Sequence, residues 1–436
     1  MKMIRHRITP AFVLTLIALS VPPAESATPE LAGGKETFAM TEKREDEIVA
    51  ATRLAIDQNR KSDAVIRVVD ATGKSIPRAR VAVAQTAHEF LFGCNIYGFD
   101  RCASEAQNEA YKQRFAEMFN YATVGFYWRW YEPERGKPIY AYTDKVTAWC
   151  AERGIRMKGH PLLWGEEAGI PTWSQGQPSP EIQRQRVSDI MNRYHDKIAF
   201  WEVVNESSHL AEPKIDEPYR WARQINPTGY LIVNDYLVMA ERAPEFYELL
   251  TAAKANGVPF DGIGIQAHEP HMMRFPLDRV QKVLDHYDTL GEELHITEFT
   301  PTSGGGEITG SHRTGVWDEA AQADYAVKFY RVCFAHPSVR AITWWDLSDQ
   351  NSWLPGGGML RKDMSPKPVY DQLHRLIHEE WQTSVAGATD SDGRYSFRGF
   401  RGAYRVDVEA GGVTASRQFQ LNRQSAPEFT VVLDSK

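Results

Sequence analysis

A regular alternation of short β-rich runs with segments of helical periodicity extends from about Glu89 to Trp381. Parallel strands produce this pattern, because the chain must cross over, usually through a helix, before it can add the next parallel strand. The alternation repeats eight times. Since eight such units close into a barrel, we predict an α/β fold with a (β/α)8 TIM barrel over residues 87–382.

The elements of this barrel can be placed along the chain. The predicted strands are Glu89–Asn95, Ala122–Trp128, Ile155–Trp164, Ala199–Glu206, Tyr230–Tyr236, Asp261–His268, Glu293–Thr300 and Ala341–Leu347. The helix after the third strand has one apolar face at helical spacing, formed by Val187, Ile190, Met191, Tyr194 and Ile198. Ser179 and Pro180 precede this face and suit its cap and its first helical position.

The segments on either side of the barrel are β-rich but lack the helices. Residues 64–69 and 79–83, joined through a turn-forming segment, are typical of a hairpin-like pair of strands. Four further runs follow the barrel: Tyr395–Phe400, Tyr404–Ala410, Thr414–Leu421 and Phe429–Leu433. Because two strands alone are marginally stable in water, we predict that residues 63–86 and 385–436 meet in one small β-sandwich into which the barrel is inserted. The alternative is two unrelated flanking pieces.

The turn at Asp390, Asp392 and Gly393 and the alternating residues of the strands after it resemble carboxypeptidase regulatory-like domains, which are of the transthyretin type. This resemblance concerns only the segment that follows the barrel. Independently of the resemblance, we expect this domain to brace the barrel, because no row of exposed aromatic residues is evident between Thr389 and Lys436.

The N-terminus has the pattern of a secretory signal peptide. Lys2, Arg5 and Arg7 precede an apolar stretch over residues 11–21, and small residues follow at positions 24–27. We predict a signal peptide over residues 1–27, an N-terminal helical segment over residues 28–62, and export to the periplasm or the extracellular space. The apolar stretch is too short for a permanent membrane anchor.

Composition restricts the partners of the chain. The 436 residues carry a formal net charge of -7, which argues against nucleic acid or an anionic membrane as the main partner. Of the four cysteines, Cys94 and Cys102 are close enough in sequence to be bridged, whereas Cys150 and Cys333 lie in predicted helices and suit buried thiols. No group of Cys and His has metal-ligand spacing, so neither a metal nor an organic cofactor is expected.

Two glutamates end hydrophobic runs of the predicted barrel. Glu206 closes the fourth strand and Glu298 lies near the end of the seventh. In a (β/α)8 barrel the C-terminal ends of all strands border one mouth, so these two carboxyl groups are expected to face the same cleft. Two such groups are the minimal equipment for hydrolysing a glycosidic bond.

Further motifs at the ends of the predicted strands resemble those of family 10 glycoside hydrolases, the xylanase family. They are Gly159–Trp164 on strand 3, Trp201–Glu206 on strand 4, Asn234–Tyr236 on strand 5, Gly264–His268 on strand 6, Ile296–Glu298 on strand 7, and Trp345, Asp349, Ser352 and Trp353 after strand 8. The resemblance covers nearly all of the barrel and neither flank.

The resemblance implies roles for individual residues. Glu206 would be the general acid/base and Glu298 the nucleophile of a retaining mechanism, with Glu206 protonated while Glu298 is ionised. Asn205 would bind the sugar 2-OH, and His268 would contact Glu298. His160 and Gln266 would be ligands of sugar hydroxyls, although a core role is also open for both. Trp345 and Trp353 would form an aromatic wall. Trp164 is a further substrate-binding candidate that could equally belong to the core.

Departures from the family limit the prediction of substrate. On strand 2 the xylanases carry a Glu-Asn pair and a Lys, whereas here the strand leads into Gly125, Phe126 and Arg129. The presence of Phe126, Tyr127 and Trp128 at this position favours stacking on the sugar, or blockage of the subsite, over recognition by hydrogen bonds. We also include Arg129 among the substrate-binding candidates. Thr300 stands where an Asp usually steadies the His beside the nucleophile, so the pH profile is expected to differ.

The sequence therefore predicts a monomeric, secreted, retaining β-glycosidase that acts on a β-linked plant polysaccharide or oligosaccharide. An endo-1,4-β-xylanase-like activity is the best single prediction. One alternative keeps the chemistry on another β-glycan or β-glycoside. The other is a carbohydrate-binding protein with a vestigial catalytic centre.

Overall fold

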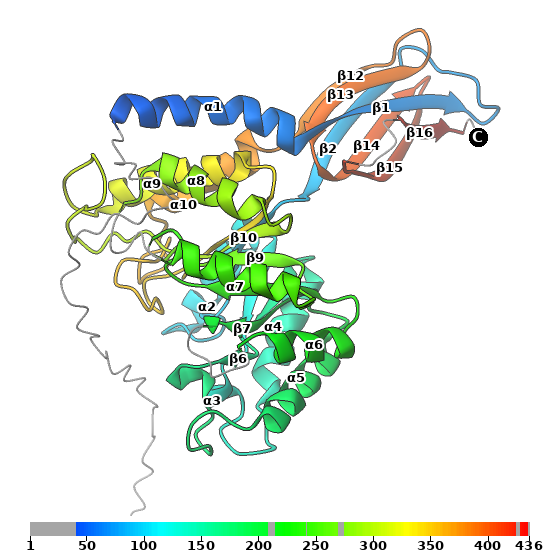
Figure 1. The fold of residues 1–436 in the computed structure, drawn as a ribbon. Helices are drawn as coiled ribbons and strands as arrows, with labels where there is room; N and C mark the ends of the chain where they lie inside the picture. The colour runs from blue at the N-terminus through cyan, green and yellow to red at the C-terminus, as the bar shows by residue number, and fades with distance from the viewer. Residues whose placement is uncertain (1–40, 208–213, 241, 269–273, 424–427, 435–436) are drawn as a thin grey trace, which may run out of the picture. The chain divides into compact units, whose positions relative to one another are not determined.

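Eight parallel strands form a closed barrel in the computed structural model, which describes residues 41–207, 214–240, 242–268, 274–423 and 428–434 (Figure 1). The strands are β3 (Leu91–Asn95), β4 (Tyr121–Gly125), β5 (Arg156–His160) with its extension β6 (Leu163–Trp164), β7 (Phe200–Asn205), β8 (Tyr230–Asp235), β9 (Gly262–Ile265), β10 (Glu293–Phe299) and β11 (Val339–Trp344). Pairing of β5 with β7 and of β11 with β3 completes the ring, which confirms the predicted TIM barrel.

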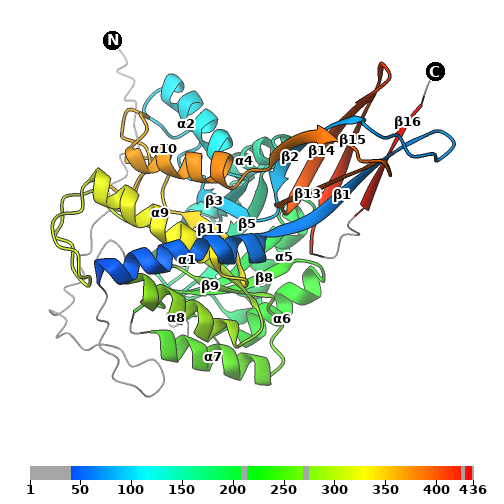
Figure 2. The same cartoon turned by 90° about the horizontal axis from the view of Figure 1, so that it is seen from above.

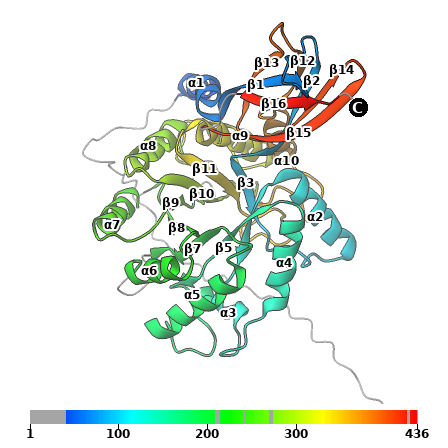
Figure 3. The same cartoon turned by 90° about the vertical axis from the view of Figure 1, so that its right-hand side faces the viewer.

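Helices surround the barrel (Figure 3). They are α2 (Glu105–Met118), α3 (Trp128–Tyr131), α4 (Tyr140–Glu152), η1 (Glu167–Gly169), α5 (Pro180–Tyr194), α6 (Asp216–Ile225), α7 (Ala243–Ala255), α8 (Leu277–Asp288), α9 (Glu319–Ala335), α10 (Pro368–Arg375) and η4 (Leu376–Glu380). Helix α5 begins at Pro180 after Ser179, as predicted, and buries Val187, Ile190 and Tyr194. The predicted strand Ala122–Trp128 is too long, because the chain leaves β4 at Gly125 and turns into α3 at Trp128.

The chain segments before and after the barrel pair with each other in two small sheets (Figure 1). Strand β1 (Lys61–Asp70) lies between β13 (Arg394–Phe400) and β16 (Glu428–Leu433). In the second sheet, β2 (Arg80–His88) lies between β12 (Ser384–Ala388) and β14 (Gly402–Ala410), and β14 continues to β15 (Val413–Leu421). Each sheet thus joins residues that are about three hundred positions apart in the sequence.

The prediction of a hairpin-like pair in the N-terminal flank is wrong. Strands β1 and β2 belong to different sheets, and the segment between them crosses from one sheet to the other. Both strands bury alternate residues in one core, with Ile66 and Val68 from β1 and Val81 and Val83 from β2. Two strands that each have a single apolar face can bury both faces only by packing them against each other, which a flat two-stranded hairpin does not allow. The likeness to carboxypeptidase regulatory-like domains stays a prediction.

Helix α1 (Glu42–Arg60) connects to the barrel through a buried ionic cluster. It packs along α9 and α8 (Figure 2). Near its start, Glu45 is almost fully buried and forms ion pairs with Arg274 (3.2 Å), Arg313 (2.9 Å) and Lys328. Burial alone would raise the pKa of Glu45, but Lys328, Arg274 and Arg313 together lower it to about 2. The helix is therefore held by a carboxylate that stays ionised in the folded protein.

All four cysteines are free thiols, so the suggested bridge between Cys94 and Cys102 is wrong. Cys94 is buried in β3, and Cys150 and Cys333 are buried in helices α4 and α9, as predicted for the last two. Within the described part of the chain, no helix combines the length and the apolar character that spanning a bilayer requires. The predicted signal peptide lies outside the described residues.

Replacing Glu45 by Gln is expected to lower the free energy of unfolding by about 3 kcal/mol at pH 7, because the buried Arg274 would keep Asp324 (3.0 Å) but lose its buried carboxylate partner. The pKa of Glu45 is depressed in the folded state, so its stabilisation is present above about pH 4.5 and is lost as the pH falls toward 2. Urea denaturation of both proteins across this range should therefore show a difference that shrinks on acidification. Glu42→Gln, at an exposed position of the same helix, is the control; an equal effect there would contradict the prediction.

Candidate active site

Glu206 follows β7 directly and accepts hydrogen bonds at both carboxylate oxygens. The indole Nε1 of Trp164 donates to Oε2 (2.9 Å), and the amide Nε2 of Gln266 donates to Oε1 (2.7 Å). The backbone of Glu206 has a φ of 52°, in the left-handed region that non-glycine residues rarely adopt. Such strained residues cluster at functional sites, where the surrounding structure maintains them.

Glu298 lies in β10 and is 4% exposed. Its Oε1 accepts a hydrogen bond from Asn234 Nδ2 (3.0 Å), and its Oε2 lies 2.8 Å from His268 Nε2. The carboxyl group is thus held from two neighbouring strand ends, β8 and β9, at the same mouth of the barrel.

The two glutamates share one network of amide groups. Asn234 donates not only to Glu298 but also to Asn205 Oδ1 (2.8 Å). Gln266, which donates to Glu206, lies 3.5 Å from the same Asn205 oxygen. The structure therefore brings together the predicted residues Asn205, Glu206, Gln266 and Glu298 in a single hydrogen-bonded unit, and it adds Asn234.

Thr300 supports His268 from the side opposite Glu298. The Thr300 hydroxyl lies 2.9 Å from His268 Nδ1 and also 2.9 Å from the backbone carbonyl oxygen of Glu298, to which it donates. With its hydrogen on that carbonyl, the hydroxyl oxygen accepts from Nδ1. The neutral hydroxyl fixes the ring but does not favour the imidazolium form as a carboxylate would.

A buried ionic cluster lies beneath the glutamates, inside the barrel. Lys158 is 1% exposed and Glu202 is fully buried, and the Glu202 carboxylate contacts both the Lys158 ammonium and His160 Nδ1. Lys158 and His160 lower the pKa of Glu202 to about 2 against the effect of burial, which alone would raise it. The Nε2 atom of His160 lies 3.2 Å from the Tyr127 hydroxyl, so His160 has a partner at each ring nitrogen.

The same cluster contains the one arrangement, among the described residues, in which three side chains could reach a common metal ion. One ligand atom each of His160, Glu202 and Glu298 lies within 4.8 Å of the others. However, the Lys158 ammonium already contacts Glu202 and supplies the positive charge that a metal ion would bring. This donor set therefore suits an internal ion pair better than a metal centre.

The surroundings of Glu298 favour its protonated form. Burial raises its pKa, the carboxylates of Glu202 and Glu206 raise it further, and His160 and Lys158 oppose this shift. The expectation that Glu298 is ionised in the substrate-free protein is therefore opposed by its environment. The Glu206 carboxylate adds to this shift, so the charge states of Glu206 and Glu298 are linked.

Aromatic rings line the mouth beside this network. Trp345 makes edge-to-face contacts with His160 (5.3 Å between ring centroids) and His268 (6.0 Å). Trp353 contacts His268 in the same manner (5.1 Å) and is 48% exposed. The backbone N–H of Trp353 donates to the buried Asp346 (3.1 Å), which fixes this exposed ring. Both tryptophans and His160 thus lie near the two glutamates, as predicted.

The region after β4 differs from the prediction. Phe126 and Trp128 are fully buried core residues and cannot stack on a ligand. Only Tyr127 is directed toward the site, where its ring also contacts Trp164 (5.9 Å). Arg129 lies in α3 and pairs with Glu167 of η1 (2.9 Å), outside the network around the glutamates. Its role in substrate binding stays a prediction.

The glycine runs after β10 and β11 pack against each other. Ser303 N–H donates to the Gly356 carbonyl oxygen (3.0 Å), and a Cβ atom on Gly356 would lie 2.6 Å from the Gly304 nitrogen. Lys367 donates to the same carbonyl (3.1 Å) and to Ser303. The glycines are therefore required for a close approach that supports the loop carrying Trp353.

Comparison with known proteins agrees with this geometry. The model of the glycosyl hydrolase family 10 domain matches residues 86–375, which is more than half of the chain. The chain belongs to glycosyl hydrolase family 10. Xylanase 10B of Thermotoga petrophila RKU-1, solved in complex with xylobiose, has a similar fold, with a TM-score of 0.57, 23% identity, and coverage of 67% of this chain and 95% of that one.

Three curated relatives of this family 10 chain have low identity. The anti-sigma-I factor RsgI6 of Acetivibrio thermocellus is 28% identical over 82% of the chain and 46% of its own length. Endo-1,4-beta-xylanase 2 of Arabidopsis thaliana is 24% identical over 92% of the chain and 37% of its own length. Endo-1,4-beta-xylanase B of Thermotoga neapolitana is 26% identical over 62% of the chain and 84% of its own length. The chain thus spans less than half the length of the first two relatives.

Sequence reasoning missed Lys158 and Glu202, and it did not separate Tyr127 from Phe126 and Trp128. A signal for the first two was present, because each is a charged residue inside a run that predicts a buried parallel strand, and such a residue needs an internal partner. That the two residues partner each other follows from the closure between β5 and β7. No comparable signal distinguished Tyr127 from its buried neighbours.

Charge changes in this cluster are expected to move the pKa of Glu298 in opposite directions. Glu202→Gln removes a negative charge and leaves Lys158, so the pKa of Glu298 should fall. Lys158→Met removes a positive charge and leaves Glu202 with His160 alone, so the pKa of Glu298 should rise. Carbon-13 NMR titration of the carboxyl groups measures both, with the Glu298 signal assigned by its loss in Glu298→Gln. Shifts of the same sign in the two variants would contradict the electrostatic coupling, and circular dichroism verifies that each variant is folded.

Proposed function

We propose that this family 10 chain is a retaining β-glycosidase that hydrolyses β-1,4-linked plant polysaccharide, with endo-1,4-β-xylanase-like activity. Glu206 is the general acid/base and Glu298 is the nucleophile. The observation that carries the proposal is the shared amide network of Asn205, Asn234 and Gln266, which holds these two carboxyl groups at the ends of β7 and β10. The xylanases among the relatives and solved structures support the choice of substrate.

In the first step, a Glu298 oxygen attacks the anomeric carbon and the bond from that carbon to the glycosidic oxygen breaks. Glu206 transfers its proton to the departing oxygen, so the leaving sugar is released as an alcohol. In the second step, the Glu206 carboxylate removes a proton from water, and the water oxygen displaces Glu298 from the anomeric carbon. Each step inverts the configuration of the anomeric carbon, so the two steps together retain it.

This reaction needs the proton on Glu206 and the negative charge on Glu298. Asn234 is suited to the charge, because its amide N–H donates to one Glu298 oxygen. His268 stabilises the charge through Nε2 in its imidazolium form, since Nδ1–H is already donated to Thr300. Gln266 and Trp164 orient Glu206. Since Asn205 uses Oδ1 for both neighbouring amides, its Nδ2 group is the part that would donate to the sugar 2-OH.

Substrate binding is proposed to rely on stacking more than in other members of the family. Trp345 and Trp353 form the wall of the central subsites, and sugar rings present apolar faces that pack on aromatic rings. Near β4, the Tyr127 hydroxyl is engaged by His160, so its ring is the surface offered to a sugar. Xylan is the first substrate to test, followed by mixed-linkage glucan and aryl β-glycosides.

We further propose that the flanking sheets are a carboxypeptidase regulatory-like domain that braces the barrel, and that the protein is exported and monomeric, without nucleic-acid or membrane partners. The paired strands on both sides of the barrel and the turn at Asp390, whose Oδ1 accepts from the backbone of Asp392 and Arg394, support the first part. The signal-peptide pattern of residues 1–27 supports export.

Substitution of either glutamate should abolish hydrolysis of xylan, with a loss of about 10²-fold to 10⁴-fold for Glu206→Ala. The two variants should differ on aryl β-xylobiosides with an acidic phenol as leaving group. Glu206→Ala should keep the first step, because such a leaving group departs without a proton, whereas Glu298→Ala should not form the intermediate. A burst of released phenol, measured by stopped-flow absorbance, distinguishes them.

The matched control is Glu117→Gln, which alters an exposed acidic residue of α2 paired with Arg114 (3.2 Å) and should leave turnover unchanged. Undiminished hydrolysis in both glutamate variants would contradict the assignment. Binding of xylo-oligosaccharides without turnover by the wild type would favour the carbohydrate-binding alternative, and release of soluble products from glucan alone would change the substrate.

Thr300→Asp is expected to shift the acidic limb of the kcat/KM profile to lower pH. A carboxylate beside His268 Nδ1 favours the imidazolium form, which stabilises ionised Glu298 through Nε2 and lowers the pKa of Glu298. In the wild type, whose Glu298 pKa is raised by burial, this limb should lie above the ordinary carboxyl range. Thr300→Val, which keeps the shape without charge, is the control; an equal shift there would contradict the mechanism.

A further inference from the structure

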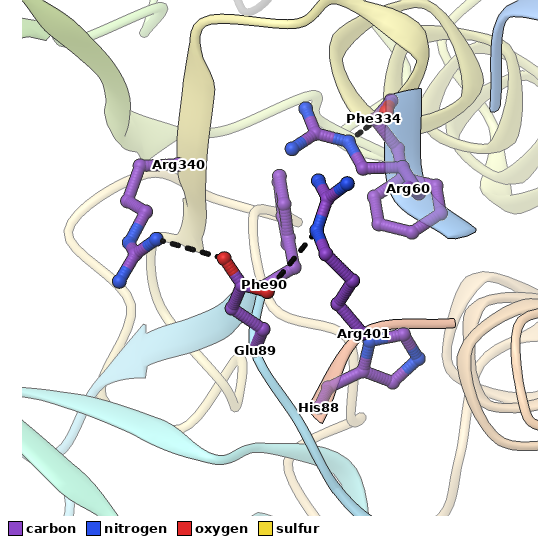
Figure 4. Close-up of a pocket in the computed structure, with 7 residues that line it drawn as sticks. All are labelled: Arg60, His88, Glu89, Phe90, Phe334, Arg340 and Arg401. Atoms are coloured by element: carbon purple, nitrogen blue, oxygen red, sulfur yellow. Dashed lines mark hydrogen bonds and ion pairs between the residues drawn. The ribbon is translucent and has the colours of Figure 1, made fainter. Parts of the chain in front are cut away.

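A small cavity lies at the N-terminal end of the barrel, where the barrel, helix α1 and the flanking sheets meet (Figure 4). Its volume is about 20 Å³. The residues that line it come from all three parts. They are Arg60 from the end of α1, His88 from the end of β2, Glu89 and Phe90 from the link between β2 and β3, Phe334 from α9, Arg340 from β11, and Arg401 from the turn before β14. Glu206 and Glu298 are at the opposite end of the strands.

The lining is strongly positive. Three guanidinium groups, those of Arg60, Arg340 and Arg401, accompany a single carboxylate, that of Glu89. His88 does not change this balance at neutral pH, because burial lowers its pKa to about 4. The lining therefore carries a net charge of +2 in a partly enclosed space, where uncompensated charge is costlier than on an open surface.

Arg60 is the least compensated member of this set. Its side chain is 8% exposed, and its Nε and Nη2 atoms donate to the backbone carbonyls of Phe334, His336 and Val339. No carboxylate among the described residues forms an ion pair with it. Its charge is instead opposed by Arg401, whose repulsion acts with burial to lower the pKa of Arg60.

Arg340 and Arg401 compete for Glu89. Arg401 Nε lies 3.1 Å from one Glu89 oxygen, and Arg340 Nη1 lies 3.4 Å from the other and 3.7 Å from Glu293, which is outside the lining. The Nε atom of Arg340 is buried and has no hydrogen-bond partner within the part of the chain that the structure describes. This N–H group lacks a hydrogen-bond acceptor, and the side chains around it carry excess positive charge. A negatively charged acceptor would accept the hydrogen bond and also reduce the excess charge.

We propose that this cavity is a binding site for one small monovalent anion, such as chloride. About 20 Å³ accommodates one water-sized particle. An oxyanion with several oxygens, or the carboxylate of a sugar acid, would exceed this space. The anion neutralises part of the charge of Arg60, Arg340 and Arg401, and it thereby links the flanking sheets and α1 to the barrel.

Bromide locates the site directly in the wild-type protein. Crystals soaked in sodium bromide should give an anomalous difference peak inside the cavity, within hydrogen-bond reach of the arginine side chains. Absence of such a peak at 200 mM bromide, with the cavity occupied by water alone, would overturn the proposal. Because this experiment uses the unmodified full chain, it is independent of whether any variant folds.

Thermal unfolding tests the coupling to stability. When sodium chloride replaces sodium gluconate at constant ionic strength, the Tm should rise and saturate; for a Kd of about 10 mM, 200 mM chloride increases the folded-to-unfolded ratio by about 20-fold. Arg340→Gln should weaken this response. Glu89→Gln should strengthen it, since the competing carboxylate is removed, whereas a purely structural role for Glu89 predicts only a lower Tm.

Arg331→Gln is the matched control, because it removes the same charge from α9 at a position paired with Glu380 and outside the cavity lining. Its chloride response should equal that of the wild type. A chloride dependence that is identical in the wild type, Arg340→Gln and Glu89→Gln would also overturn the proposal, because the effect would then arise elsewhere on the protein.

Discussion

Closure of the parallel barrel is the constraint on which the site depends. The pairings of β11 with β3 and of β5 with β7 turn an open sheet into a ring, so the C-terminal ends of all strands surround one mouth. Glu206 and Glu298 are far apart in the sequence, yet Asn205, Asn234 and Gln266 connect them because β7, β8 and β9 are successive neighbours. A sheet that remained open between β5 and β7 would lose this arrangement.

Buried charge is the second organising feature, and its effect depends on how completely each charge is paired. Glu45 and Glu202 each face more than one cation, and both carboxyl groups therefore have pKa values near 2 in spite of burial. Glu298 is also buried, but its partners are an amide and an imidazole, so burial and neighbouring carboxylates raise its pKa. The proposed chemistry, by contrast, needs Glu298 ionised and the proton on Glu206, so the bound substrate has to overcome this preference of the free protein.

The sequence could predict those parts of the molecule that depend on local patterns. The eight strands follow from periodicity, the start of α5 from Ser179 and Pro180, and the two glutamates from motifs at strand ends. Contacts between distant segments could not be read in this way. The placement of β1 and β2 in different sheets, and the pairing of Lys158 with Glu202, are decided by which faces meet after closure. Phe126 and Trp128 were misjudged because an aromatic residue has the same identity in a core and in a cleft.

The residues proposed for catalysis lie at the C-terminal end of the barrel, and the contacts that hold α1 and the flanking sheets lie at its N-terminal end. At the C-terminal end, donors converge on carboxyl groups from successive strands, and several of these residues carry strain or shifted pKa values. At the N-terminal end, Arg60 and Arg401 connect α1 and the flanking sheets to the first residues of β3 and β11. Because no residue of this second group touches the glutamate network, changes there should act on folding and on the docking of the flanking sheets. The flanking sheets therefore influence catalysis only to the extent that they keep the barrel closed.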